Sequence, residues 1–65
     1  MNEAQILQYV VDGIDKLRKD NESFLAAGRA INYDEYRHVC GVIRGLTYAE
    51  SIIKDLAQKL ELANE

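Results

Sequence analysis

The sequence predicts an all-α protein, a two-helix antiparallel hairpin that we expect to dimerise into a four-helix bundle. Proline is absent and glycine occurs only four times in 65 residues, so few residues interrupt a helix. Apolar residues recur at steps of three and four, as on one face of a helix, and do not alternate as in a strand. A short segment that begins with a glycine separates two such stretches, which indicates a hairpin.

The first helix is predicted over residues 2–27. Asn2 is a residue type that caps helices, and the acidic Glu3 follows it. Gly28 provides the left-handed conformation that commonly ends a helix. In a heptad reading, one core position holds Leu7, Ile14, Asn21 and Gly28, and the other holds Val10, Leu17 and Phe24.

Residues 28–32 are predicted to form the joint, and a connection this short favours antiparallel neighbours. Asn32 is followed three residues later by Glu35, as in a capping box. Ile31 and Tyr36 flank this cap at the spacing of a hydrophobic staple. The predicted joint and cap residues are Gly28, Asn32, Tyr33 and Glu35.

The second helix is predicted over residues 33–63. One heptad position holds Val39, Leu46, Ile53 and Leu60, and the other holds Val42, Ala49, Leu56 and Ala63. Further apolar residues lie beside this seam or on the first helix, beyond what one hairpin can cover: Tyr36, Ile43, Tyr48, Ile52, Ile6, Val11 and Leu25. This surplus predicts a second copy or another protein as a partner.

Small residues recur every four positions in the second helix, at Gly41, Gly45 and Ala49. Two interior glycines destabilise a helix by about 2 kcal/mol relative to alanine, so a compensating contact is expected. Close approach of another helix, room for a bulky side chain such as Phe24, and a hinge are the three alternatives. The predicted packing and partner interface comprises Tyr36, Cys40, Gly41, Ile43, Arg44, Gly45, Tyr48, Ala49 and Ile52.

Several polar residues allow two interpretations. Asn21 either fixes the register from a core position or is solvated where the first helix bends away. A cluster at the start of the second helix is either an interaction hot spot or a cover for the hairpin end: Tyr33, Tyr36, Arg37 and His38. The carboxylates, including Asp15 and Glu50, are expected mostly on outward faces, where Glu50 has the helix-stabilising spacing to Lys54.

The residue types argue against catalysis and against a metal site. Cys40 is the only cysteine, and it is expected to act as a small buried hydrophobe. His38 and Cys40 are the only soft ligands, whereas structural zinc sites use four. The sequence contains no Glu-x-x-His pair, phosphate-binding loop or nucleophile with a base. We therefore expect a non-enzymatic protein without a cofactor or small-molecule substrate.

Size and charge narrow the class further. A chain of 65 residues builds a marginal core, which self-association commonly supports. The net charge is −3, which disfavours nucleic-acid binding; a DNA-binding dimer is the lesser alternative, with cations from Arg18, Lys19, Arg29, Arg37 and Arg44. No signal peptide or stretch of about 20 apolar residues is seen, so a cytoplasmic protein that does not bind membranes is expected.

Residues 33–46 read Tyr-x-x-Tyr-Arg-x-x-x-Gly-x-Ile-x-Gly-Leu. This pattern resembles small helical proteins encoded by tailed bacteriophages. The resemblance implies a phage origin, a location in the host cytoplasm or the virion, and a structural or assembly role in binding a larger protein. The alternative is a small phage inhibitor or regulator of a host protein. The matching residues are glycines and tyrosines of structural type, and they bring no active site with them.

Overall fold

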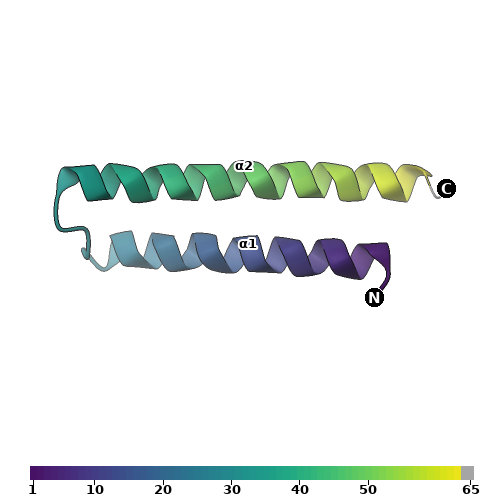
Figure 1. Cartoon of the computed structure of the whole chain (residues 1–65), viewed down its shortest axis with the longest axis horizontal. Helices are drawn as coiled ribbons and strands as arrows, with labels where there is room; N and C mark the ends of the chain where they lie inside the picture. The colour runs from purple at the N-terminus through teal and green to yellow at the C-terminus, as the bar shows by residue number, and fades with distance from the viewer. Residues whose placement is uncertain (64–65) are drawn as a thin grey trace.

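The chain forms two long helices, α1 (Glu3–Ala26) and α2 (Tyr33–Ala63), in a computed structural model that describes residues 1–63. The helices lie side by side and antiparallel, with the joint at one end and both chain ends at the other (Figure 1). The predicted all-α antiparallel hairpin is confirmed. Residues 64–65 of the predicted 1–65 domain, and the side chain of Ala63 in the predicted seam, lie outside the described part.

Local hydrogen bonds fix both ends of α1. The Asn2 side chain accepts a hydrogen bond from the Gln5 backbone N–H at 2.8 Å, and the Asn2 N–H donates to the Gln5 side chain at 2.9 Å. At the other end Gly28 has φ +71°, which is favourable only for glycine. The N–H groups of Gly28 and Arg29 donate to the carbonyls of Leu25 and Phe24, the Schellman pattern that satisfies the last turn.

Asn32 caps α2 as predicted, because its side chain accepts a hydrogen bond from the Glu35 N–H at 2.8 Å. The predicted hydrophobic staple is wrong, since Ile31 is 81% exposed. Tyr36 instead stacks on Tyr33, with the ring centroids 6.3 Å apart. The cap therefore rests on one hydrogen bond and on aromatic packing within α2.

The hairpin seam, meaning the residues through which the two helices face each other, differs from the predicted one. Its members are all buried or half-buried: Leu7, Val11, Ile14, Arg18, Asn21 and Leu25 of α1, and Val39, Ile43, Leu46, Glu50, Ile53, Ala57 and Leu60 of α2. The predicted second core positions are buried only in part. Val10, Leu17 and Leu56 are 37%, 55% and 43% exposed, whereas Phe24, Val42 and Ala49 are half-buried, as is Val11.

Both helices carry two neighbouring apolar stripes, so a spacing of three and four fits either choice of seam. Asn21 does belong to the seam, and α1 continues through it to Ala26, so the alternative of a solvated bend is wrong. The Asn21 amide donates to the Leu17 carbonyl of its own helix at 2.7 Å. Its polar group is thereby satisfied without a partner on α2.

A single hairpin buries little. Among the described side chains only Val39 (7% exposed) and Glu50 (8%) are buried. The accessible surface is 5222 Å², whereas a compact protein of 7.4 kDa exposes about 4,200 Å². The radius of gyration is 15.0 Å, against about 11 Å for a globular domain of this length. The chain is a thin rod that leaves about 1,000 Å² more surface in water than a compact fold does.

Candidate interaction surface

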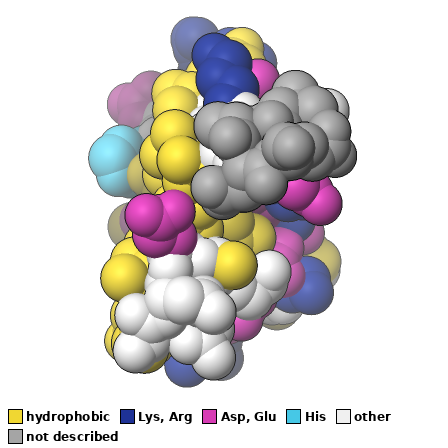
Figure 2. All heavy atoms as spheres, turned by 90° about the vertical axis from the view of Figure 1, so that its right-hand side faces the viewer, with side chains coloured by type: hydrophobic (Ala, Val, Ile, Leu, Met, Phe, Trp, Pro, Cys, Tyr) yellow, Lys and Arg dark blue, Asp and Glu magenta, His cyan; other side chains and the backbone are white. Residues whose placement is uncertain are grey.

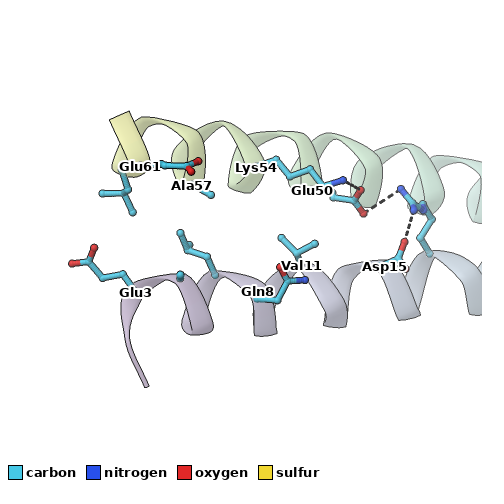
Figure 3. Close-up of a pocket in the computed structure, with 12 residues that line it drawn as sticks. Glu3, Gln8, Val11, Asp15, Glu50, Lys54, Ala57 and Glu61 are labelled. Atoms are coloured by element: carbon cyan, nitrogen blue, oxygen red, sulfur yellow. Dashed lines mark hydrogen bonds and ion pairs between the residues drawn. The ribbon is translucent and has the colours of Figure 1, made fainter. Parts of the chain in front are cut away.

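One side of the hairpin carries a network of ion pairs. Arg18 of α1 lies 3.2 Å from Glu50 of α2, and it also pairs with Asp15 and, at 3.7 Å, with Glu22. Glu50 in turn accepts from Lys54 at 2.9 Å (Figure 3). This network joins the two helices at mid-length, where the seam would otherwise be apolar.

Glu50 was expected on an outward face, and this expectation was wrong, because the side chain is buried between the helices. Its contact with Lys54 and the nearby Arg18 hold the pKa of the Glu50 carboxyl below its usual value. Lys19 and Arg18 lower the pKa of Asp15 in the same way. One Glu50 oxygen faces Arg18 without hydrogen-bond geometry, so that contact is electrostatic.

The same side opens into a groove of about 750 Å³ between the start of α1 and the end of α2. Its floor is apolar and its rims are acidic (Figure 3). Leu7, Val11 and Leu60 contribute to the floor, and Glu3 and Glu61 lie at the rims. The residues on this side, such as Gln8, Asp15, Lys54 and Glu61, each follow a seam residue by one position.

The opposite side of the hairpin is apolar. A helix turns by about 100° per residue, so residues one position before the seam lie on one flank of α1 and one flank of α2. Because the helices run antiparallel, the two flanks are on the same side. This apolar face comprises Ile6, Val10, Gly13, Leu17 and Phe24 of α1, and Val42, Gly45, Ala49, Ile52 and Leu56 of α2.

A view onto the chain ends agrees with this division. Hydrophobic side chains gather mainly on the left in Figure 2, and acidic and basic side chains gather mainly on the right. Several large residues of the apolar face are open to water, since Leu17 is 55% exposed, Ile52 67% and Leu56 43%, whereas Phe24 and Val42 are half-buried. Asp20 interrupts this stripe on α1, and His38 and Lys59 bound it on α2.

The glycines of the two helices have no packing role within one chain. A Cβ atom added at Gly13, Gly41 or Gly45 would meet no other atom within 4 Å. Close approach of α1 to the small residues of α2 is therefore not seen, and Phe24 does not occupy the space beside them. Both alternatives are wrong for contacts inside the hairpin, and Gly13 and Gly45 lie on the open apolar face.

The turn end carries a second exposed surface. Tyr33 is 68% exposed and stacks on Tyr36, and the Arg37 guanidinium lies 5.9 Å from the centroid of the Tyr33 ring. The neighbouring Cys40 side chain, one turn along α2, raises the pKa of the Tyr36 hydroxyl. The two rings pack on each other within α2, and Tyr36 is 47% exposed.

The structure divides the nine predicted interface residues among several surfaces. Gly45, Ala49 and Ile52 belong to the apolar face, and Ile43 lies in the seam. Cys40 and Arg44 each follow a seam residue by one position, so they lie on the groove side, and Tyr36 belongs to the exposed turn end. Gly41 and Tyr48 are exposed on the outer surface of α2.

The pairing of Arg18 with Glu50 was missed at the sequence level. The sequence did contain a signal for this pair. Arg18 follows Ile14 by four residues and Glu50 follows Leu46 by four residues, so both continue the seam at helical spacing. The half of the apolar face on α1 was missed as well, since Val10 and Leu17 were placed in the core.

Within residues 1–63 no three His, Cys, Asp or Glu side chains come close enough to hold a metal ion. Neither described helix combines the length and the apolar character needed to cross a membrane. Comparison with models of protein families, with curated proteins and with solved structures finds no match to this chain.

Proposed function

We propose that this protein is a non-enzymatic structural module that pairs with a second copy of itself through the apolar face. The observation that carries the proposal is the exposure of that face along most of both helices. A single hairpin has almost no buried side chains among those that the structure describes, so a second apolar layer would supply the core that it lacks. Two stacked hairpins form a four-helix bundle.

The excess exposed surface of the hairpin is of the size expected for association of two copies. The excess surface of about 1,000 Å² per chain gives about 2,000 Å² when two copies pack together. Stable protein interfaces bury about 1,200–2,000 Å². The ion pairs around Arg18 lie between the helices and on the other side of the hairpin, so association through the apolar face does not bury these charges further.

A matched pair of variants tests the proposal. Ile52→Glu places a charge on the apolar face, and we expect light scattering to give the mass of one chain, or circular dichroism to show loss of helix. Ser51→Glu introduces the same charge at an exposed neighbouring position off the face, and it should leave mass and helix content unchanged. An Ile52→Glu protein with native mass and native melting would contradict the proposal.

The aromatic cluster at the turn favours a second role, contact with a larger protein. Tyr and Arg are enriched among residues that dominate binding energies, and Tyr33 and Arg37 remain exposed when the apolar face is covered. With the resemblance to phage proteins, this supports a virion or assembly component, with a host-protein inhibitor as the alternative. Co-purification with capsid or tail proteins supports the first role, and stoichiometric recovery of a host enzyme supports the second. Tyr33→Ala should weaken either association.

A further inference from the structure

The groove between the start of α1 and the end of α2 is an apolar trough bordered by carboxylates. We propose that it binds a basic amphipathic helix of another protein. The apolar side chains of that helix enter the groove, and its Lys or Arg side chains meet the acidic rims. This inference goes beyond the proposed dimer, because the groove lies on the side of the hairpin away from the apolar face.

The dimensions of the groove fit a short helix. Its lining residues run from Glu3 to Arg18 on α1 and from Glu50 to Glu61 on α2. At 1.5 Å per residue the two walls are about 16–23 Å long, which a helix of about 11–15 residues covers. The volume of about 750 Å³ lies within the range of about 300–1,000 Å³ that is typical of binding pockets.

The floor of the groove is apolar and only half covered. Leu7 and Val11 of α1 and Ala57 and Leu60 of α2 line it, and each of these side chains is half-buried. Val11 and Ala57 point from the two helices into the same space (Figure 3). A third helix laid along this space buries the remaining apolar surface of both helices, which is favourable.

The rims determine which kind of helix fits. Glu3 and Glu61 lie level with each other at the open end of the groove, one on each helix (Figure 3). Among the side chains that the structure describes, neither carboxylate takes part in an ion pair. Farther along the α1 rim, the exposed Asp12 accepts a hydrogen bond from Gln8 at 2.8 Å. The open end of the groove is therefore negative on both helices.

The cations that line the groove do not neutralise this end. Arg18 and Lys54 both pair with Glu50, at the end of the groove nearer the middle of the hairpin. The last turn of α2 carries no basic residue. Glu61 lies near this negative end of the helix dipole, where a carboxylate is unfavourable. A Lys or Arg side chain of an incoming helix would relieve the repulsion.

The same charges disfavour other occupants. Nucleic acids and anionic lipid headgroups carry the same sign of charge as the rims. A second copy of this chain offers no cation from its apolar face, and its own groove would bring a second pair of carboxylates against the first. The partner that complements the groove is therefore a polypeptide with apolar and basic side chains at helical spacing.

A designed peptide serves as the probe. It has about 14 residues, with leucines at every third or fourth position and lysines elsewhere. We expect saturable binding to the native chain in fluorescence anisotropy, and NMR shifts at the methyl groups of Leu7, Val11 and Leu60. Shifts confined to Leu17 and Ile52 would place the peptide on the apolar face and overturn the proposal. Equal binding of a peptide with glutamates in place of the lysines would overturn it as well.

Two double variants with the same change in net charge test the rims. Glu3→Gln with Glu61→Gln should weaken peptide binding about 2- to 30-fold, as expected for two exposed ion pairs. Asp34→Asn with Asp55→Asn removes two exposed carboxylates away from the groove and should leave binding unchanged. Circular dichroism verifies that both proteins are helical. Equal affinity of the two double variants for the peptide would contradict the role of the rims.

The mass of the chain without peptide separates this inference from the proposed dimer. A one-chain mass contradicts the dimer and leaves the peptide test intact, because the groove is formed within one hairpin. A two-chain mass with no saturable peptide binding below about 1 mM contradicts the groove proposal alone.

Discussion

At the residue scale, the hairpin is organised by a single charged pair in a seam that is otherwise apolar except for Asn21. Arg18 and Glu50 occupy positions that an aliphatic residue would fill without a desolvation cost. Their contact sets the register of α1 against α2, because a shift of either helix would leave a half-buried charge without its partner. Because each helix has two similar apolar stripes, apolar packing alone would allow more than one pairing of the helices, and the charged pair favours one of them.

Stability is expected to fall in acid. The pKa values of Asp15 and Glu50 are lower in the folded chain than in the unfolded one. The ionised carboxylates therefore stabilise the fold at any pH above their pKa in the unfolded chain. This stabilisation is lost as the pH falls through their lower pKa in the folded chain, which places the loss below about pH 4.

The Tm from circular dichroism should be level between pH 7 and pH 5 and should decline towards pH 3. Glu50→Gln should flatten this decline, and Glu61→Gln, at the rim of the groove, serves as the control. A Tm that is unchanged between pH 5 and pH 3 in the native chain would contradict the role given to the ion pairs.

At the scale of the elements, the joint and the caps were predictable because they follow local rules. Asn2, Gly28 and Asn32 act where the sequence placed them, since a cap depends on a few adjacent residues. The seam was not predictable in the same way. Val10 and Val11 both fit the helix period, and only the pairing of the two whole helices decides which of them faces inward.

The joint gives a prediction of its own. Gly28→Ala forces a side chain into the left-handed region and should lower the free energy of unfolding by about 1–2 kcal/mol. Asn32→Ala removes the cap of α2 and should lower the free energy of unfolding by about 1 kcal/mol. Arg29→Ala, in the same joint, should have little effect in the same urea titrations. Equal stability of all three variants would contradict the capping geometry.

Substitutions of the two glycines of α2 test whether another helix packs against one side of α2. In a helix that touches nothing, Gly→Ala stabilises by about 1 kcal/mol. We expect Gly41→Ala, on the outer surface, to raise the free energy of unfolding by this amount. Gly45→Ala should lower the free energy of unfolding, because the added methyl group would separate the two copies of the proposed dimer. Urea unfolding at equal chain concentration measures both. A stabilised Gly45→Ala protein with native mass would show that no helix approaches there.

At the scale of the whole molecule, the hairpin leaves an apolar face of its two helices largely open to water. The predicted surplus of apolar residues is present, but its position was predictable only in part, through Gly45, Ala49 and Ile52. The α1 half of the face requires the two helices to be placed relative to each other, which periodicity alone does not do. The groove and the aromatic turn lie outside this face.

The central claim is that the apolar face is covered by a second copy. Sedimentation equilibrium of the unmodified chain over a hundredfold range of concentration tests it most directly. We expect a mass of twice 7.4 kDa, with dissociation and loss of helix together at the lowest concentrations. A helical protein of 7.4 kDa at every concentration would contradict the claim.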